Sequence, residues 1–215
     1  MLVQEKAFLL SRIHHSDSSF IINCFTENYG YKTFILKGAK KKYAAYIQSM
    51  SPILITFRTS EKDNLQVLYQ IDFFALPISI QDQINKTGIL FFQNEILKNV
   101  LFEGQVDKEL FEFLEQEYNW LYHANNVKNY MFFWLFECIA KIGFSANNYV
   151  DSFQDSIENK LFHQFKELSK KEILEIKISS IEKEKLLSAI LHYYQLKIPN
   201  FKKINSISTF KEIWE

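Results

Sequence analysis

The sequence predicts an α+β fold in which a small five-stranded β-barrel is followed by an all-α region. Up to about residue 75, β-branched and aromatic residues occur in short runs separated by polar turns, which is typical of strands. From residue 79, apolar residues recur at helical spacing instead. Pro77 lies where the pattern changes, so we expect two domains, residues 1–77 and residues 78–215. With 47% hydrophobic residues, the chain can bury a substantial core.

The predicted strands follow one another closely along the chain. They are Ala7–Ile13, Phe20–Thr26, Tyr31–Lys37, Ile53–Arg58 and Leu65–Phe73. The second and third should form a hairpin, because Gly30 in the turn between them can adopt a positive φ. A closed barrel is the expected arrangement, since closure removes the edges that an open sheet would expose.

The predicted helical region begins at Ser79–Asp82, which resembles a capping box, and its first helix should continue until Gly104. Gly143 and Pro199 are placed to end two later helices. The stretch MFFWLFECIAKIGF (residues 131–144) is apolar nearly all round and should lie at the centre of the helical domain. The further predicted helices are Lys108–Tyr122, Val127–Ile142, Phe153–Leu168, Glu182–Leu196 and Ser208–Trp214.

The motifs of common catalytic sites are absent from the sequence. It contains no HExxH, GxSxG or DxDxDG motif, and five glycines offer little material for a phosphate-binding loop. His14 and His15 are adjacent on an extended segment, so their side chains should face opposite ways rather than converge on one atom. Cys24 and Cys138 form neither a disulfide framework nor a set of metal ligands. We therefore expect no enzyme, no cofactor and no small-molecule substrate.

The sequence also lacks the signals of a membrane or secreted protein. No apolar run approaches the roughly 18 residues that a membrane span requires. The N-terminus has no basic segment followed by an apolar stretch. We expect a cytoplasmic protein that does not contact the membrane.

The segment LKGAKKKYAAYI (residues 36–47) concentrates positive charge in a chain whose formal net charge is zero. Phosphates are bound by positive charge and bases stack on flat side chains, so a lysine track beside tyrosines suits single-stranded nucleic acid. The tyrosines could instead pack beneath the segment, and the segment could be only a solvated loop. The expected DNA-binding residues are Lys37, Lys40, Lys41 and Lys42, with Lys32 and Arg12 as flanks and Tyr43 and Tyr46 as stacking candidates.

The stretch FLLSRIHHSDSSFIINCFTENYGYKTFILKGAKKK (residues 8–42) resembles the opening of the RecO family of bacterial recombination mediators. The family pattern matches at Phe25-Thr26, Gly30 and Lys37-Gly38-Ala39, and it continues through Pro52 and the strands ILITFR and NLQVLYQIDF. The end of the chain, LLSAILHYYQLKIPNFKKINSISTFKEIW, is similar to the closing helices of the family. No single motif is diagnostic, and the resemblance rests on the order in which these motifs follow one another along the chain.

The resemblance implies an N-terminal OB-fold, a C-terminal helical domain and a role as a recombination mediator in DNA repair. Such a protein binds single- and double-stranded DNA, anneals complementary strands, and acts with RecR to load recombinase onto strands coated by single-stranded-DNA-binding protein (SSB). Lys202 and Lys203, near Tyr193 and Phe201, are candidate contacts for the acidic SSB C-terminal tail. The alternative is a protein-interaction adaptor whose OB-fold binds proteins rather than DNA.

The sequence departs from the family pattern in two ways. Many members carry a four-cysteine zinc module after a segment similar to KIGFSANN (residues 141–148), but no cysteine follows it here, so zinc is not expected. Arg12 and Arg58 are the only arginines, and lysine lacks the bidentate fork of arginine. We therefore expect weak sequence discrimination and strong salt sensitivity. Without zinc, the segment should be held by the packing of Tyr149, Phe153, Leu161 and Phe165.

Overall fold

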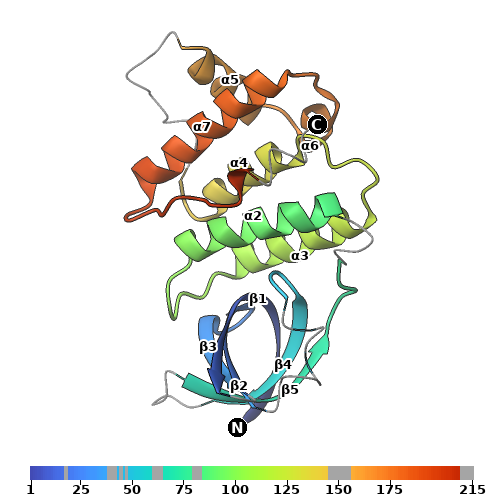
Figure 1. Cartoon of the computed structure of the whole chain (residues 1–215), viewed down its shortest axis with the longest axis vertical. Helices are drawn as coiled ribbons and strands as arrows, with labels where there is room; N and C mark the ends of the chain where they lie inside the picture. Colours follow the sequence, from blue (N-terminus) through green and yellow to red (C-terminus); the bar gives the residue numbers. More distant parts are fainter. Residues whose placement is uncertain are drawn as a thin grey trace. The chain divides into compact units, whose positions relative to one another are not determined.

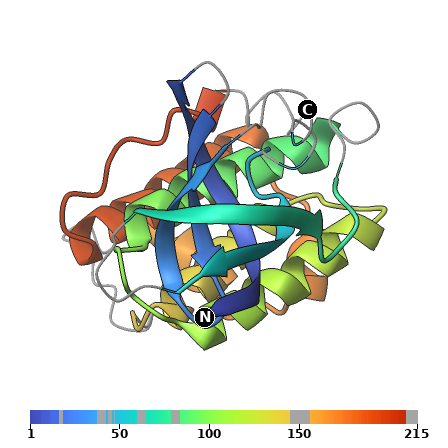
Figure 2. The same ribbon diagram turned by 90° about the horizontal axis from the view of Figure 1, so that it is seen from below.

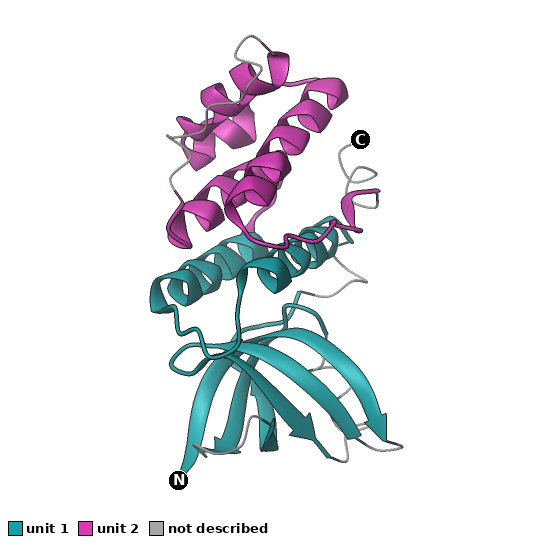
Figure 3. Ribbon diagram, turned by 90° about the vertical axis from the view of Figure 1, so that its left-hand side faces the viewer, with its two compact units in different colours: residues 1–123 teal, residues 124–215 magenta. Residues whose placement is uncertain are grey.

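The computed structural model describes residues 1–16, 19–37, 43, 46, 48–59, 65–78, 84–144 and 156–208. The chain divides into two compact units, residues 1–123 and residues 124–215 (Figure 3). The first contains all the described strands and two helices, and the second contains the remaining described helices. The expected domain boundary at residue 77 lies between the last strand and the first described helix, inside the first unit, and it stays a prediction.

The first unit begins with a closed five-stranded barrel (Figure 1), which confirms the predicted fold class. The barrel order is β1-β2-β3-β5-β4, and β3 and β5 form the parallel pair while the other neighbours are antiparallel. Closure satisfies the backbone groups that sheet edges would expose. The strands are β1 (Leu2–Ser16), β2 (Ser19–Thr26), β3 (Gly30–Leu36), β4 (Pro52–Arg58) and β5 (Leu65–Phe73).

Strand β1 is longer than its predicted range, Ala7–Ile13, and includes His14 and His15. Its first part pairs with β4 and its second part pairs with β2. A register shift between Leu9 and Ser11 marks a bulge near the point where β1 passes from one neighbour to the other. Residues 2–6 and 14–16, outside the predicted range, do not alternate between apolar and polar side chains, so pairing with two different strands decides the length of β1.

Alternate residues of the strands fill the barrel, as the period-two pattern of a β-strand requires. Cys24 lies in this core, and burial raises the pKa of its thiol, which keeps the thiol protonated and unreactive. The buried residues of the barrel core are Ala7, Leu9, Ile22, Cys24, Phe34, Leu36, Tyr43, Ile53, Ile55, Phe57, Leu68 and Ile71.

Aromatic side chains on the other face of β1 and β2 join the barrel to helix α3 (Lys108–His123), which follows α2 (Ile84–Val100). The rings of Phe8 and Phe25 contact Phe111, with centroid separations of 5.5 and 5.7 Å. Tyr118 also contacts Phe8, and its hydroxyl accepts the N–H of Ile78 at 2.9 Å. Burial raises the pKa of Tyr118 to about 12. This shared core explains why the first compact unit includes helices as well as strands.

Gly30 lies at the β2–β3 turn with φ +68°, which confirms the predicted positive φ. The loop between α2 and α3 packs on this turn: the N–H of Tyr31 donates to the carbonyl of Gln105 at 3.3 Å, and the N–H of Gly104 donates to the carbonyl of Tyr31 at 3.1 Å. A Cβ at Gly30 would lie 1.9 Å from the Gln105 carbonyl oxygen. Both the backbone angle and the close approach therefore require glycine.

The second unit has its own core around helix α4, as expected for its aromatic stretch. Trp134 and Leu135 on α4 are buried, and the hydroxyl of Tyr194 on α7 donates to the carbonyl of Leu135 at 2.7 Å. Gly143 follows α4 with φ +92°, which confirms its predicted role at the end of this helix. The helices are α4 (Tyr130–Lys141), α5 (Ile157–Lys166), α6 (Lys170–Glu175) and α7 (Ser180–Lys197).

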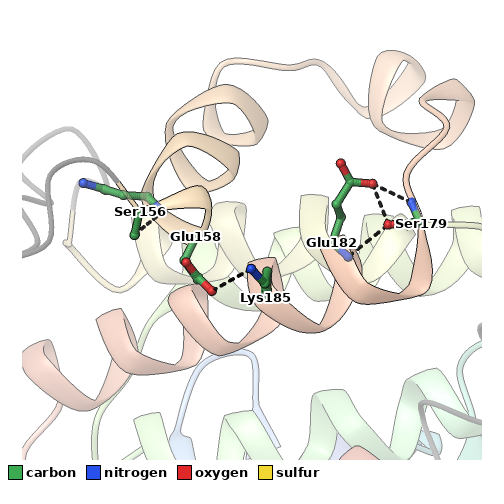
Figure 4. Close-up of polar contacts among 6 residues, drawn as sticks. Ser156, Glu158, Ser179, Glu182 and Lys185 are labelled. Atoms are coloured by element: carbon green, nitrogen blue, oxygen red, sulfur yellow. Dashed lines mark hydrogen bonds and ion pairs between the residues drawn. The ribbon is translucent and has the colours of Figure 1, made fainter.

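Helix α6 does not follow from the sequence patterns above, and it begins at a capping box formed by Ser169 and Glu172. Helix α7 begins in the same way at Ser179 and Glu182 (Figure 4). The capping box expected at Ser79–Asp82 lies outside the described residues, as does the final helix beyond Ser208. Among the helices of the described residues, none has both the length and the apolar character needed to cross a membrane.

Candidate nucleic-acid interface

The described cations of the predicted DNA site lie on the β1–β2–β3 side of the barrel. Lys37 is exposed directly after β3, Lys32 is half-buried within β3, and Arg12 is exposed on β1. Since each strand residue advances about 3.3 Å, Lys32 and Lys37 are roughly 16 Å apart along the chain. Lys32 pairs with the core residue Cys24, and Lys37 is five positions further on, so the two lysines lie on different faces of the extended chain. Lys40, Lys41 and Lys42 lie outside the described residues.

The two tyrosines after the lysines pack against the barrel. Tyr43 is 6% exposed and belongs to the barrel core. Tyr46 stacks on Phe73 with a centroid separation of 4.4 Å and also contacts the edge of Tyr43. Of the two roles that the sequence left open, these contacts favour packing, because Tyr43 has no free face for a base and Tyr46 uses one face for Phe73. The tyrosines therefore anchor the chain that leaves the lysine segment.

The β1–β2 hairpin places Arg12 and His14 on one face of the sheet. Arg12 pairs with Ile22 and His14 with Phe20, and the rings of His14 and Phe20 meet edge to face at 5.4 Å. His15 is the next residue of the same strand, and the register between β1 and β2 shifts between His14 and Ser16. The hairpin contributes the positive charge of Arg12 and the rings of His14 and Phe20.

The outer face of the barrel carries residues to which the sequence patterns assign no role. Ser11, Asn23 and Thr33 form a chain of hydrogen bonds across β1, β2 and β3, with Asn23 Nδ2 donating to Ser11 Oγ at 2.7 Å and Thr33 Oγ1 donating to Asn23 Oδ1 at 2.8 Å. Beside this chain runs an aliphatic row across four adjacent strands. The row consists of Ile13, Ile21, Ile35 and Val67, which are paired in register. The alternation of β-branched residues within the predicted strands was the available signal for this row.

The buried carboxylate of Glu5 serves the fold rather than a reaction. Glu5 is 5% exposed, and it accepts hydrogen bonds from the backbone N–H and the Nδ2 of Asn28 at the β2–β3 turn. Desolvation raises its pKa above the ordinary value, although the Asn28 bonds act in the opposite direction. Glu5 therefore fixes the turn that precedes Gly30.

The residues of this chain do not fit the four-cysteine zinc module of the family. The whole sequence has two cysteines, Cys24 in the barrel and Cys138 on α4, and both are buried. Within the described residues, no three His, Cys, Asp or Glu side chains come together as a metal site. Leu161 and Phe165 are buried on α5, as expected for packing, whereas Tyr149 and Phe153 lie outside the described residues.

The candidate partner-binding lysines lie on the segment that follows α7. Lys202 and Lys203 are exposed, and the preceding Phe201 packs its ring on Tyr194 with centroids 5.6 Å apart. Tyr193 is 1% exposed, so it is not available to line a binding surface. Lys202 and Lys203 are therefore surface cations next to the ring of Phe201, which packs on Tyr194.

Comparison with known proteins agrees with the architecture. Residues 1–76 match the family model described as "Recombination protein O N terminal". The chain is 25% identical over its whole length to the full-length "DNA repair protein RecO" of Flavobacterium psychrophilum, and 27% identical to that of Flavobacterium johnsoniae. The protein of the same name from Christiangramia forsetii is 25% identical, again over both whole chains.

A closed five-stranded barrel that is followed by helices defines this chain as an OB-fold protein with a C-terminal helical region. The matched N-terminal model and the full-length relatives make the assignment more specific. The N-terminal model covers residues 1–76, and over its whole length the chain is similar to proteins named DNA repair protein RecO.

Proposed function

We propose that this protein is a recombination mediator in DNA repair that binds single- and double-stranded DNA through the lysine segment of its barrel. The proposal rests on the positions of the two described residues on either side of that segment, Lys37 and Tyr43. The segment leaves β3 at the exposed Lys37, and it rejoins the barrel core at the buried Tyr43. Arg12 on β1 and Lys32 on β3 add charge on the same barrel.

Binding in this proposal is electrostatic and independent of sequence. Lysines exchange phosphates easily because each acts as a flexible point charge, and displaced counterions favour association. Reversible contacts of this kind let two complementary strands meet on one protein and anneal. The protein supplies no catalytic group, acts without turnover and works in the cytoplasm.

The decisive experiment measures binding of a short labelled single strand by fluorescence anisotropy over a salt series. Replacing Lys40, Lys41 and Lys42 together with alanine should weaken binding and make the log–log salt slope shallower by roughly two to three units. The control is a triple-alanine variant at the exposed residues Lys98, Lys171 and Lys177, which changes the net charge equally. If both variants keep the wild-type slope, the lysine segment is a solvated loop and the proposed interface is wrong.

The same proposal includes RecR and the SSB C-terminal tail as partners. The exposed pair Lys202 and Lys203, next to the fixed ring of Phe201, suits an acidic peptide that ends in an apolar residue. A Lys202→Ala/Lys203→Ala variant should bind an SSB tail peptide several-fold more weakly while its affinity for the labelled strand is unchanged. Unchanged peptide affinity would remove this pair from the proposal.

The aliphatic row on the outer face of the barrel, exposed at Ile13 and partly buried at Ile21, Ile35 and Val67, keeps a protein-interaction adaptor as the second candidate. An adaptor would bind DNA little at any salt concentration, whereas a mediator should show a steep negative slope. The wild-type salt series therefore separates the two functions before any variant is compared.

A further inference from the structure

Three hydrogen-bonded polar side chains cross the outer face of the barrel on neighbouring strands. The blue strands β1, β2 and β3 run side by side in Figure 2, and Ser11, Asn23 and Thr33 are paired across them. The residues before and after Asn23, Ile22 and Cys24, belong to the barrel core, so Asn23 faces outward. All three polar residues are partly exposed, so a ligand on this face can reach them.

The two hydroxyl groups fix the plane of the Asn23 amide. Asn23 Nδ2 donates to Ser11 Oγ at 2.7 Å on one side, and Asn23 Oδ1 accepts from Thr33 Oγ1 at 2.8 Å on the other. Among the described residues, these are the two partners of the amide. Since an amide has two N–H groups and two lone pairs, one of each remains for a ligand. They lie next to each other on the outer edge of the amide, because β1 and β3 occupy its two flanks.

Aliphatic side chains and a cation adjoin the amide on the same face. The next outward-facing residues along β2 and β3 are Ile21 and Ile35, which are partly exposed members of the aliphatic row. Lys37, where the lysine segment begins, is exposed and follows Ile35 by two positions. Because a strand advances about 3.3 Å per residue, Lys37 lies roughly 13 Å along the chain from Thr33. A flat ring can therefore rest against the isoleucines while a phosphate of the same DNA strand reaches Lys37.

We propose that Asn23, held in place by Ser11 and Thr33, binds the base-pairing edge of an unpaired base in single-stranded DNA. Each of the four bases carries a donor next to an acceptor on this edge, so the amide can pair with any of them. In a duplex the opposite base occupies the same edge, and the contact is lost. Asn23 thus favours single strands without reading their sequence. This inference rests on the proposed DNA function and adds a base contact to the phosphate contacts of the lysine segment.

The chemistry of the amide edge favours a base over other ligands. A phosphate or a carboxylate has acceptors only, so it would meet the remaining lone pair of Asn23 Oδ1 unfavourably. A peptide backbone offers a donor and an acceptor, but it brings no negative charge to Lys37. A nucleic acid satisfies both groups at once, with its base at Asn23 and its phosphate at Lys37.

The test compares two labelled single strands of about twelve nucleotides, a length within the range that one OB-fold binds. One is oligo(dT), and the other contains N3-methylthymine, which lacks the N3–H donor of thymine. Both carry the same phosphates, so the lysine contacts cancel when the two affinities are divided. By fluorescence anisotropy at one salt concentration, the wild type should bind oligo(dT) about five- to tenfold more tightly, as expected for the loss of about one hydrogen bond.

A matched pair of variants assigns this ratio to Asn23. Asn23→Leu should bring the ratio close to one, whereas Asn119→Leu, the same change at an exposed position of α3, should leave it unchanged. A lower folded fraction weakens the binding of both strands equally, so reduced stability of a variant does not change the ratio. In NMR spectra of the wild type, the side-chain NH₂ signals of Asn23 should shift with oligo(dT) and not with an equal concentration of the methylated strand.

The possible outcomes separate this contact from the proposed function. The base contact is wrong if the wild type binds both strands equally, or if Asn23→Leu keeps the wild-type ratio, and the three polar residues then serve only the fold. If the wild type binds neither strand, the proposed DNA function is wrong and the base contact with it. Weaker binding by the lysine variant with an unchanged ratio would support separate phosphate and base contacts.

Discussion

Gly30 and Gly104 have similar backbone angles but different surroundings. Their φ angles are +68° and +77°, so alanine is strained at either position. Only at Gly30 would a Cβ also collide with another backbone atom, the Gln105 carbonyl oxygen, whereas nothing lies within 4 Å at Gly104. The sequence shows that Gly30 belongs to a turn, but it does not show that a loop some 75 positions later lies against it.

We therefore predict different costs for the two alanine variants. Gly104→Ala should lower the free energy of unfolding by about 1–2 kcal/mol, the strain of a left-handed residue. Gly30→Ala should lower it by about 2–4 kcal/mol, because the α2–α3 loop must also move. Urea unfolding curves measure both, and equal costs would show that the loop yields freely.

The buried carboxyl of Glu5 predicts a pH-dependent stability. Its pKa is raised mainly by desolvation, so the folded state favours the protonated form. The folded protein thus gains stability relative to the unfolded chain as the pH falls through the raised pKa toward the ordinary value of 4.5.

A Glu5→Gln variant, which keeps an acceptor for Asn28, removes this titration. Its stability relative to the wild type should be greatest at neutral pH and should decrease as the pH falls through that window. Thermal melts from neutral to acidic pH measure the difference, with Glu112→Gln on the exposed side of α3 as control. A difference that stays constant with pH would contradict the assignment of the shift to Glu5.

At the scale of elements, helix starts are decided by local side chains. The Ser179 hydroxyl accepts the N–H of Glu182, and the Glu182 carboxylate accepts the N–H of Ser179 (Figure 4). These bonds lower the pKa of Glu182, so their contribution is present above its ordinary pKa and is lost as the pH falls through the lowered value.

Ser179→Ala should therefore lower the melting temperature of the protein, with a cost of about 1 kcal/mol that is typical of a lost N-cap. Ser180→Ala, one position further along and also exposed, should change the melting temperature little. Circular dichroism melts of the two variants make the comparison. If the two variants melt together, the capping box contributes nothing measurable.

At the scale of the whole molecule, the chain divides into two compact units, residues 1–123 and residues 124–215. Tyr194→Phe removes a buried hydrogen bond to Leu135 in the second core and should cost about 1–2 kcal/mol. Hydrogen exchange of α4 and α7 amides should then accelerate more than that of the barrel strands. Equal acceleration in both units would show that the chain opens as one cooperative body.

Several features follow from the sequence alone because they depend on neighbouring residues. The period-two and helical patterns predict the barrel and the helices that follow, and Gly30 and Gly143 mark a turn and a helix end. The concentration of lysines after β3 is likewise visible without a structure, although its role in DNA binding stays a proposal.

Other features depend on residues that are distant in the sequence, and only the tertiary structure decides them. The full length of β1 depends on two partner strands, and the burial of Tyr43 depends on the barrel interior that encloses it. The aliphatic row from Ile13 to Val67 exists because four strands align in register. The alternation of apolar and polar residues indicates which face of a strand is buried, whereas the pairing of strands determines which side chains become neighbours.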